Sequence, residues 1–354
     1  MDTITQGLLG AATAQLGFRQ RIGPGATWAA VATAIVPDLD IFLAPLMQLT
    51  GSEMAEGAVS RIHRGLSHSL LMVPIIAAVV AGIWYLLRRR RQVDPAAAPF
   101  WMLYACCFVA ALSHPLLDWC TSYGTQLLAP FTDRRFAIDA APIIDLIYTA
   151  TLILTLGACR IVRKLTRKPR RVTLTIGWIG FVLSVAYLGA GRVMHDRVVR
   201  RAVGMVPRTE RVLRADAYPA IGTIFLWRTV VETPHRWHVR RVRPFGPVGD
   251  RSRTVPKVAN EWTRQAADVP AAKTFRWFAM GRVRRTYLPL DGRHVVEFHD
   301  MRYGATLEDP DSLWSLQVVL GADKKVLEVS RRRHYRRDGF GKAVVRMWRD
   351  MWEP

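Results

Sequence analysis

The sequence predicts a membrane domain made of helices, followed by a soluble α+β domain. Long apolar runs lie before about residue 193, and the rest of the 354-residue chain is mixed and rich in Arg. A run of roughly 20 apolar residues is long enough to cross a bilayer as a helix. Short runs rich in β-branched and aromatic residues favour strands instead. We therefore expect a polytopic domain at 1–193 and a soluble α+β domain at 194–354.

About six helices are expected in the first domain. The first is a short amphiphilic stretch at about 4–17, where Gly7, Gly10 and Gly17 are small enough to permit close helix packing. The other five approach bilayer-spanning length, and they cover about 26–47, 69–87, 99–119, 143–162 and 172–191.

The second domain contains runs that are typical of antiparallel strands. They combine β-branched and aromatic residues with partial alternation of polar and apolar positions. The clearest examples are at 223–231, 237–242 and 294–299, and a helix is expected at about 256–280.

The loop charges predict the orientation of the helices. Four consecutive arginines at 88–91 and seven basic residues within 160–171 mark two loops as cytoplasmic. If the six helices alternate, the loops at about 48–68 and 120–142 lie outside. The N-terminus and the second domain are then also external, because long domains cross the membrane largely regardless of their charge.

The net charge of +22 indicates anionic partners. There are 50 Lys and Arg residues against 28 acidic residues, which suits contact with the headgroups of membrane lipids. Nucleic acid is the competing interpretation of such a charge. The sequence contains no nucleic-acid-binding motif, so we expect lipids and not nucleic acid as partners.

Ionisable residues from distant parts of the sequence meet at the outer face under this topology. His114 and Asp118 are four residues apart, so they share one face of a helix. Charged groups at the edge of a membrane segment are costly and usually functional. The predicted topology brings further ionisable residues to the same face, namely Asp38, Asp40, His63, His68 and Asp145.

This constellation predicts a site for a divalent metal. Imidazole and carboxylate ligands suit zinc, which we expect, and manganese is the alternative. The predicted metal ligands are Asp38, His63, His68, His114 and Asp118. Asp40 is expected to act as a ligand or a base beside the metal, and Arg64 to orient a phosphate.

Each of these residues also has a structural interpretation. His114 and Asp118 could form a hydrogen-bonded pair, and Asp38 and Asp40 could cap a helix or form a turn. Asp145 could balance the charge of an arginine. The joint clustering of the residues favours the metal site.

The ordered motifs resemble the YdjM-like family of inner-membrane-associated, metal-dependent hydrolases. They are Met-Asp-Thr-Ile-Thr-Gln-Gly-Leu-Leu-Gly at 1–10, Pro-Asp-Leu-Asp at 37–40, His-Arg-Gly-Leu-Ser-His-Ser at 63–69, His-Pro-Leu-Leu-Asp at 114–118 and Pro-Ile-Ile-Asp at 142–145. The resemblance covers roughly residues 1–190. The family is distantly similar to the zinc-dependent phospholipase C and P1 nuclease group, where an all-helical fold holds several zinc ions.

The resemblance implies hydrolysis of a phosphoester, in a lipid or lipid-linked substrate, at the periplasmic face of a bacterial inner membrane. Gln6 departs from the family pattern, which usually has a His after the Thr. Glutamine is a poor ligand for transition metals, so this chain could hold fewer ions or use Gln6 only as a hydrogen-bond partner. Ser67 and Asp145 are expected beside the ligands. Two alternatives stay open: a non-catalytic scaffold, and a metal-binding or transport protein with a degenerate site.

Overall fold

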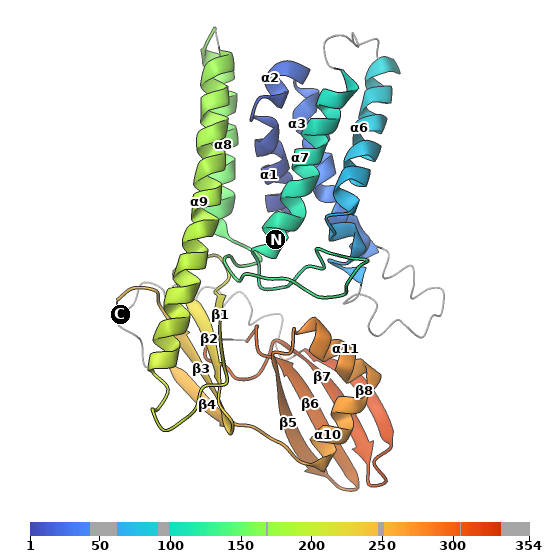
Figure 1. The fold of residues 1–354 in the computed structure, drawn as a ribbon, viewed down its shortest axis with the longest axis vertical. Coiled ribbons are helices and arrows are strands. Elements are labelled where there is room, and N and C mark those ends of the chain that lie inside the picture. The colour runs from blue at the N-terminus through green and yellow to red at the C-terminus, as the bar shows by residue number, and fades with distance from the viewer. Residues whose placement is uncertain (43–61, 91–98, 168, 247–250, 305, 334–354) are drawn as a thin grey trace. The chain divides into compact units, whose positions relative to one another are not determined.

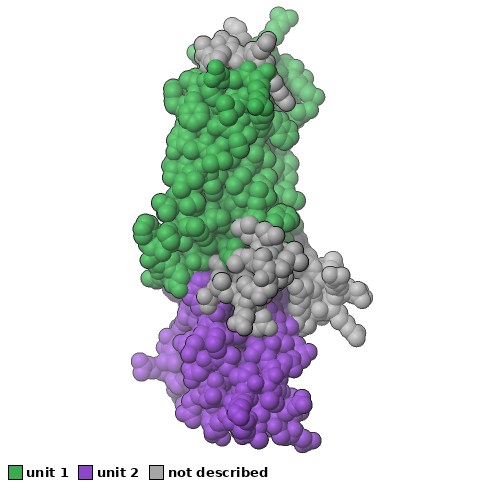
Figure 2. Space-filling view, turned by 90° about the vertical axis from the view of Figure 1, so that its right-hand side faces the viewer, with its two compact units in different colours: residues 1–191 green, residues 192–354 purple. Residues whose placement is uncertain are grey.

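The structure is a computed structural model that describes residues 1–42, 62–90, 99–167, 169–246, 251–304 and 306–333. It contains two compact units, Met1–Gly191 and Arg192–Pro354. They are coloured green and purple in Figure 2. Each unit is described by itself below.

The first unit is built from helices (Figure 1). Its elements are α1 (Thr3–Ala14), α2 (Phe18–Ile22), α3 (Gly25–Ile35), the 3-10 helices η1 (Val36–Phe42) and η2 (Leu66–His68), α6 (Met72–Arg90), α7 (Phe100–Trp119), α8 (Leu146–Leu165) and the part of α9 (Pro169–Gly204) up to Gly191. Five of these helical stretches are long and apolar enough to cross a membrane, counting only the described residues and taking α3 with η1 as one stretch. The predicted helical membrane domain is thus confirmed, and α1 is its short additional helix.

Two predicted helices differ from the observed ones. The helix expected at 26–47 changes to 3-10 geometry at Val36, beside Pro37, whose ring nitrogen has no proton to donate. The end of that prediction, 43–47, falls outside the described residues. The helix expected at 172–191 continues to Gly204, because its later turns bury Val198 and Ala202.

Small residues bring α1 and α3 into close contact. A Cβ atom added to Gly10 would lie 2.6 Å from both the carbonyl oxygen of Ala30 and the Cβ of Ala34. Small residues at such an interface allow two helix backbones to approach closely. The contact therefore places the N-terminal turn of α1 beside the end of α3, from which η1 continues.

The segment between α7 and α8 closes over the residues that precede α6. Its own ends are joined by isolated bridges between Thr121 and Ala141 and between Thr125 and Phe136. The backbone N–H of Gln126 donates to the carbonyl of Arg64 at 3.0 Å. Together with the bond from the backbone N–H of Leu70 to the carbonyl of Leu127, this bond holds residues 62–70 against the segment that follows α7.

The second unit contains two antiparallel sheets of four strands, which confirms the predicted α+β class. The first sheet has the order β1 (Arg214–Pro219), β2 (Trp227–Glu232), β3 (Arg236–Val242), β4 (Ser252–Pro256), and the second β5 (Val283–Leu290), β6 (Arg293–Asp300), β7 (Trp314–Gly321), β8 (Val326–Arg333). The helix expected at 256–280 is two helices, α10 (Glu261–Asp268) and α11 (Pro270–Phe278). Pro270 begins the second one, a position that suits its missing N–H.

Candidate metal centre

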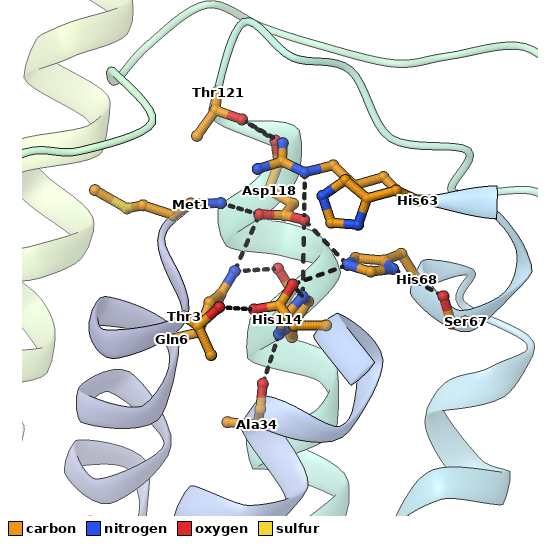
Figure 3. Close-up of polar contacts among 12 residues, drawn as sticks. Met1, Thr3, Gln6, Ala34, His63, Ser67, His68, His114, Asp118 and Thr121 are labelled. Carbon is orange, nitrogen blue, oxygen red and sulfur yellow. Dashed lines mark hydrogen bonds and ion pairs between the residues drawn. The ribbon is translucent and has the colours of Figure 1, made fainter. Parts of the chain in front are cut away.

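The metal-binding residues expected from the sequence lie together at one end of the helical unit. We call Asp38, Asp40, His63, His68, His114 and Asp118 the His–Asp cluster. The two aspartates of η1 and the two histidines around η2 meet His114 and Asp118 at the end of α7. Figure 3 shows His63, His68, His114 and Asp118 of this cluster. The hydrogen bonds and ion pairs among them join residues up to 76 positions apart.

His114 points one ring nitrogen into the cluster and the other away from it. Its Nδ1 lies 2.6 Å from the carbonyl oxygen of Ala34, at the end of α3. Its Nε2 lies 3.5 Å from Oδ1 of Asp38 and makes no hydrogen bond. Since Nδ1 faces an acceptor, the proton of a neutral ring belongs there, which leaves the lone pair of Nε2 inside the cluster.

His68 has the same arrangement, with different partners. Its Nδ1 lies 3.2 Å from Oδ2 of Asp40 and 3.0 Å from the hydroxyl of Ser67. Its Nε2 lies 3.4 Å from Oδ1 of Asp38, the same oxygen that faces His114. Both imidazoles therefore present Nε2 to one carboxylate oxygen, and their ring centroids are 4.7 Å apart.

Asp118 completes this side of the cluster. Its Oδ2 lies 3.6 Å from Nε2 of His68 and 3.7 Å from Nε2 of His114. Its Oδ1 accepts a hydrogen bond from Nε2 of Gln6 at 3.0 Å and contacts the amino group of Met1. Asp118 is thus within reach of the two histidine nitrogens while its other oxygen is held by α1.

Two distances between donor atoms match the spacing that a transition-metal ion requires, those from Oδ1 of Asp38 to Nε2 of His68 and of His114, at 3.4 and 3.5 Å. Bonds of about 2.0–2.2 Å in a tetrahedral site place neighbouring ligand atoms roughly 3.3–3.6 Å apart. Asp38, His68 and His114 each offer one ligand atom, and these atoms lie within 4.8 Å of one another. The unpartnered Nε2 of His114 is a buried polar atom that an ion would satisfy. This buried set of imidazole and carboxylate groups could therefore hold a divalent metal ion.

A second group of possible ligands shares His68 with the first. It consists of Asp40, His63 and His68, whose offered atoms also lie within 4.8 Å of one another. Here Nδ1 of His63 lies only 2.8 Å from Oδ1 of Asp40, the distance of a hydrogen bond. Burial alone would lower the pKa of the His68 imidazole, but contacts with the Asp38 and Asp40 carboxylates outweigh burial and raise it.

Arg64 lies inside the cluster region and is almost fully buried. Its Nε is 3.1 Å from Oδ2 of Asp118 without hydrogen-bond geometry, and its terminal nitrogen donates to the hydroxyl of Thr121 at 2.8 Å. The guanidinium carbon lies 4.6 Å from the ring centroid of Tyr123. Arg64 also has a backbone φ of 60°, which is uncommon outside glycine and occurs where surrounding contacts hold the chain.

Asp145 serves as the N-cap of α8. Its Oδ1 accepts from the backbone N–H groups of Ile147 and Tyr148, each at 3.0 Å, and the hydroxyl of Tyr187 donates to both carboxylate oxygens. Burial raises the pKa of the Asp145 carboxyl. Among the described contacts, no hydrogen bond or ion pair joins Asp145 to the His–Asp cluster, and its own bonds are those of a helix cap.

Three contacts of the cluster were not anticipated from the sequence. The hydroxyl of Thr3 donates to Oδ2 of Asp38 at 2.7 Å, the carbonyl of Ala34 accepts from His114, and Thr121 accepts from Arg64. Thr3 lies in the motif at residues 1–10, but that motif did not predict a role for the Thr3 side chain. The Ala34 carbonyl carries no signal of residue type, because every residue has one.

The fold and the cluster together define a polytopic helical membrane protein with a buried group of histidines and aspartates. The chain belongs to the YdjM inner membrane protein family, whose model matches residues 1–198. This match spans the helical unit and confirms the resemblance seen in the motifs. Comparison with curated proteins and with solved structures gave no match.

Proposed function

We propose that this chain is a metal-dependent hydrolase that cleaves a phosphoester in a lipid or lipid-linked substrate at the outer face of the bacterial inner membrane. The observation that carries the proposal is the convergence of two histidine Nε2 atoms on one oxygen of Asp38, with both Nδ1 atoms held from behind. Ligand histidines are usually oriented in this way by a carboxylate or a backbone carbonyl. A structural polar pair would need no such second set of contacts.

Asp38, His68 and His114 would hold the ion, with Asp118 as a fourth ligand. When bound, a zinc ion, or a manganese ion, supplies Lewis-acid chemistry by lowering the pKa of water and polarising a phosphoryl oxygen. Asp40 would keep His68 in the tautomer that binds metal and would hold a proton on Nδ1 of His63. The planar guanidinium of Arg64, adjacent to Asp118, would orient a phosphate oxygen.

The exposure of the cluster suggests where substrate arrives. The side chains of His63 and Asp38 are 21% and 12% exposed, whereas those of His68 and His114 are fully buried. Large apolar side chains lie exposed at neighbouring positions of the chain, including Leu39 and Leu66. A polar centre that opens beside apolar surface suits a substrate with a phosphate headgroup and a hydrocarbon tail.

The loop charges support the outer face as the location. α7 ends at the cluster and α6 begins beside it, whereas the arginines at the end of α6 and the basic residues at the end of α8 lie at the opposite end. Basic residues mark the cytoplasmic side of membrane helices. The His–Asp cluster would then face the periplasm. If α1 and each of the five apolar stretches cross the membrane, the second unit would lie on the same side.

A non-catalytic scaffold, or a metal-binding or transport protein, is the second candidate. Gln6 is the observation that favours it. Nε2 of Gln6 donates to Asp118 and to the carbonyl of His114, so the side chain supports the cluster where the family pattern has a possible ligand.

Metal analysis with a hydrolysis assay separates these candidates. The full chain would be purified in detergent with zinc or manganese present, and its bound metal would be measured by elemental analysis. We expect metal in the wild type, little in His114→Ala and Asp38→Ala, and wild-type content in His235→Ala, whose histidine is exposed in the second unit. Release of a phosphate-containing headgroup from phospholipids by wild type alone supports the hydrolase. Bound metal without turnover supports the second candidate, and a wild type without metal overturns the site.

A further inference from the structure

Two arginines from different helices share a polar cluster at the end of the helical unit opposite the metal centre. Arg19 lies in α2, and Arg163 lies in the last turn of α8; both helix ends are at the same end of the unit (Figure 1). The buried side chain of Gln15 joins them. Its Oε1 accepts from Arg163 at 3.0 Å, and its Nε2 lies 3.3 Å from the hydroxyl of Thr27, which also accepts from Arg19 at 3.1 Å. We call these four residues the Arg19–Arg163 cluster.

The two arginines differ from the other basic residues near them. Arg19 and Arg163 are partly buried. The neighbouring basic side chains of the same helix ends are exposed to the surroundings, namely Arg21, Arg160, Lys164, Arg167, Arg170 and Arg171. Burying a cation removes part of its hydration and is costly unless an anion compensates it. The exposed basic residues keep their hydration, whereas Arg19 and Arg163 each lose part of it.

The helices around the cluster supply no anion. Residues 3–37 and 146–191, which include α1, α2, α3, α8 and most of α9, contain no Asp or Glu. In the described part of the chain, the hydrogen bonds of the two guanidinium groups go to neutral oxygens, those of Gln15, Thr27 and Pro24. Two like charges are thus held near each other without a carboxylate from these helices.

We propose that the Arg19–Arg163 cluster binds the headgroup of an anionic phospholipid. A phosphate group fits two guanidinium donors, because arginine binds phosphate through directed, charge-assisted hydrogen bonds. Basic sites between membrane helices bind lipid headgroups in this manner. Trp28 and Leu165, one and two positions along the chain from Thr27 and Arg163, are exposed and would contact the acyl chains. A phospholipid therefore satisfies both the charge and the surrounding apolar surface.

The two arginines could bind the phosphate group of a phospholipid or free inorganic phosphate. The exposed apolar side chains favour the phospholipid, because only it has acyl chains to contact them. The site is independent of the His–Asp cluster, since it lies at the other end of the helices and uses none of its residues. Loss of lipid binding and loss of metal can therefore be measured separately in the same variants.

Lipid binding to the full chain tests the proposal. The protein would be purified in neutral detergent and titrated with phosphatidylglycerol, phosphatidylcholine or inorganic phosphate, with native mass spectrometry as the readout. We expect wild type to retain phosphatidylglycerol in preference to phosphatidylcholine, and Arg19→Gln and Arg163→Gln to bind it about tenfold more weakly. The matched control is Arg89→Gln with Arg90→Gln, which removes two exposed charges from the end of α6. Control binding should equal that of the wild type.

Three results would overturn the proposal. One is binding of phosphatidylglycerol by Arg19→Gln and Arg163→Gln at wild-type strength. Another is an equally large loss of phosphatidylglycerol binding in the control Arg89→Gln with Arg90→Gln, which would show that the lipid is attracted to basic surface in general. The third is binding of inorganic phosphate as strong as that of the lipid. Should Arg163→Gln fail to fold, Arg19→Gln gives the test alone, because Arg19 bonds only to a threonine hydroxyl and a proline carbonyl among the described residues.

Discussion

Asp40 faces Nδ1 of His68 with one carboxylate oxygen, at 3.2 Å, and Nδ1 of His63 with the other, at 2.8 Å. One side chain thus contacts two imidazoles, in each case at Nδ1. The hydroxyl of Ser67 and the backbone N–H of Arg64 donate to the same Oδ2, at 2.6 and 3.3 Å. Because these donors hold the Asp40 carboxylate against Nδ1 of His68, we interpret Asp40 as a residue that positions His68. Asp38, in contrast, faces the Nε2 atoms of His68 and His114 directly.

This difference predicts unequal effects of removing the two aspartates. Asp40→Ala should weaken metal binding by about 10–100-fold, the usual cost of losing a residue that orients a ligand. Asp38→Ala should lose the ion, because it removes a donor atom. Asp40→Asn, which retains one carbonyl acceptor, should fall between Asp40→Ala and the wild type. Competition with a metal-sensitive chelator measures the affinities, and complete loss of metal in Asp40→Ala would show that Asp40 is itself a ligand.

Gln6 contributes to the stability of the helical unit through Asp118. Gln6→Leu keeps a side chain of similar size but removes the donor to Oδ1, so a buried carboxylate oxygen loses one of its partners. Loss of a hydrogen bond to a charged group costs about 1.5–3 kcal/mol. The variant should therefore melt at a lower temperature in detergent, as followed by circular dichroism. Gln15→Leu is not a suitable control because Gln15 holds Arg163. Gln265→Leu, at an exposed position of α10, tests whether any loss of glutamine has this effect.

The sequence alone predicts the members of the His–Asp cluster better than their geometry. His114 and Asp118 could be paired from their spacing, and Asp38 and His68 could be brought to them by the alternation of apolar segments. Asp145 shows the limit of that reasoning. An aspartate directly before an apolar helix has the same sequence signature whether it caps the helix or faces a metal, and its bonds to two backbone N–H groups identify a cap.

Other differences have equally specific causes. Hydropathy marks where a helix is apolar and not where it ends, so the extension of α9 to Gly204 was not visible in the apolar run. The carbonyl of Ala34 orients His114 through the backbone, and no residue type reports that role. The α+β class of the second unit was predictable because strands such as β6 are rich in β-branched and aromatic residues. The break between α10 and α11 is marked in the sequence only by Pro270.

The buried cap of α8 predicts a pH dependence of stability. Burial raises the pKa of Asp145 in the folded chain above its unfolded value of about 3.9, so the folded state binds the proton more readily. Stability then falls as pH rises between the unfolded and folded pKa values. Asp145→Asn does not titrate and should gain stability relative to the wild type between about pH 4 and pH 7. Melting temperatures at both pH values give the comparison, with the exposed Asp291→Asn as the control; parallel shifts in the two variants would contradict the prediction.

Gly10 links the packing of the helices to the metal centre. Its added Cβ would lie 2.6 Å from the carbonyl oxygen of Ala30, a backbone atom that cannot move without moving α3. Ala34 of the same helix holds His114, and η1, which follows directly, carries Asp38. Gly10→Ala should therefore destabilise the unit by about 1–3 kcal/mol, the usual cost of overpacking, and also weaken metal binding.

The matched control for this prediction is Gly189→Ala in α9. An added Cβ there meets no atom within 4 Å, and alanine favours a helix more than glycine does. Gly189→Ala should thus melt at or above the wild-type temperature and retain the metal affinity of the wild type. Thermal unfolding in detergent and chelator competition measure the two quantities on the same samples. If Gly10→Ala matched Gly189→Ala in both, then the close contact of α1 with α3 would not be what positions Asp38 and His114.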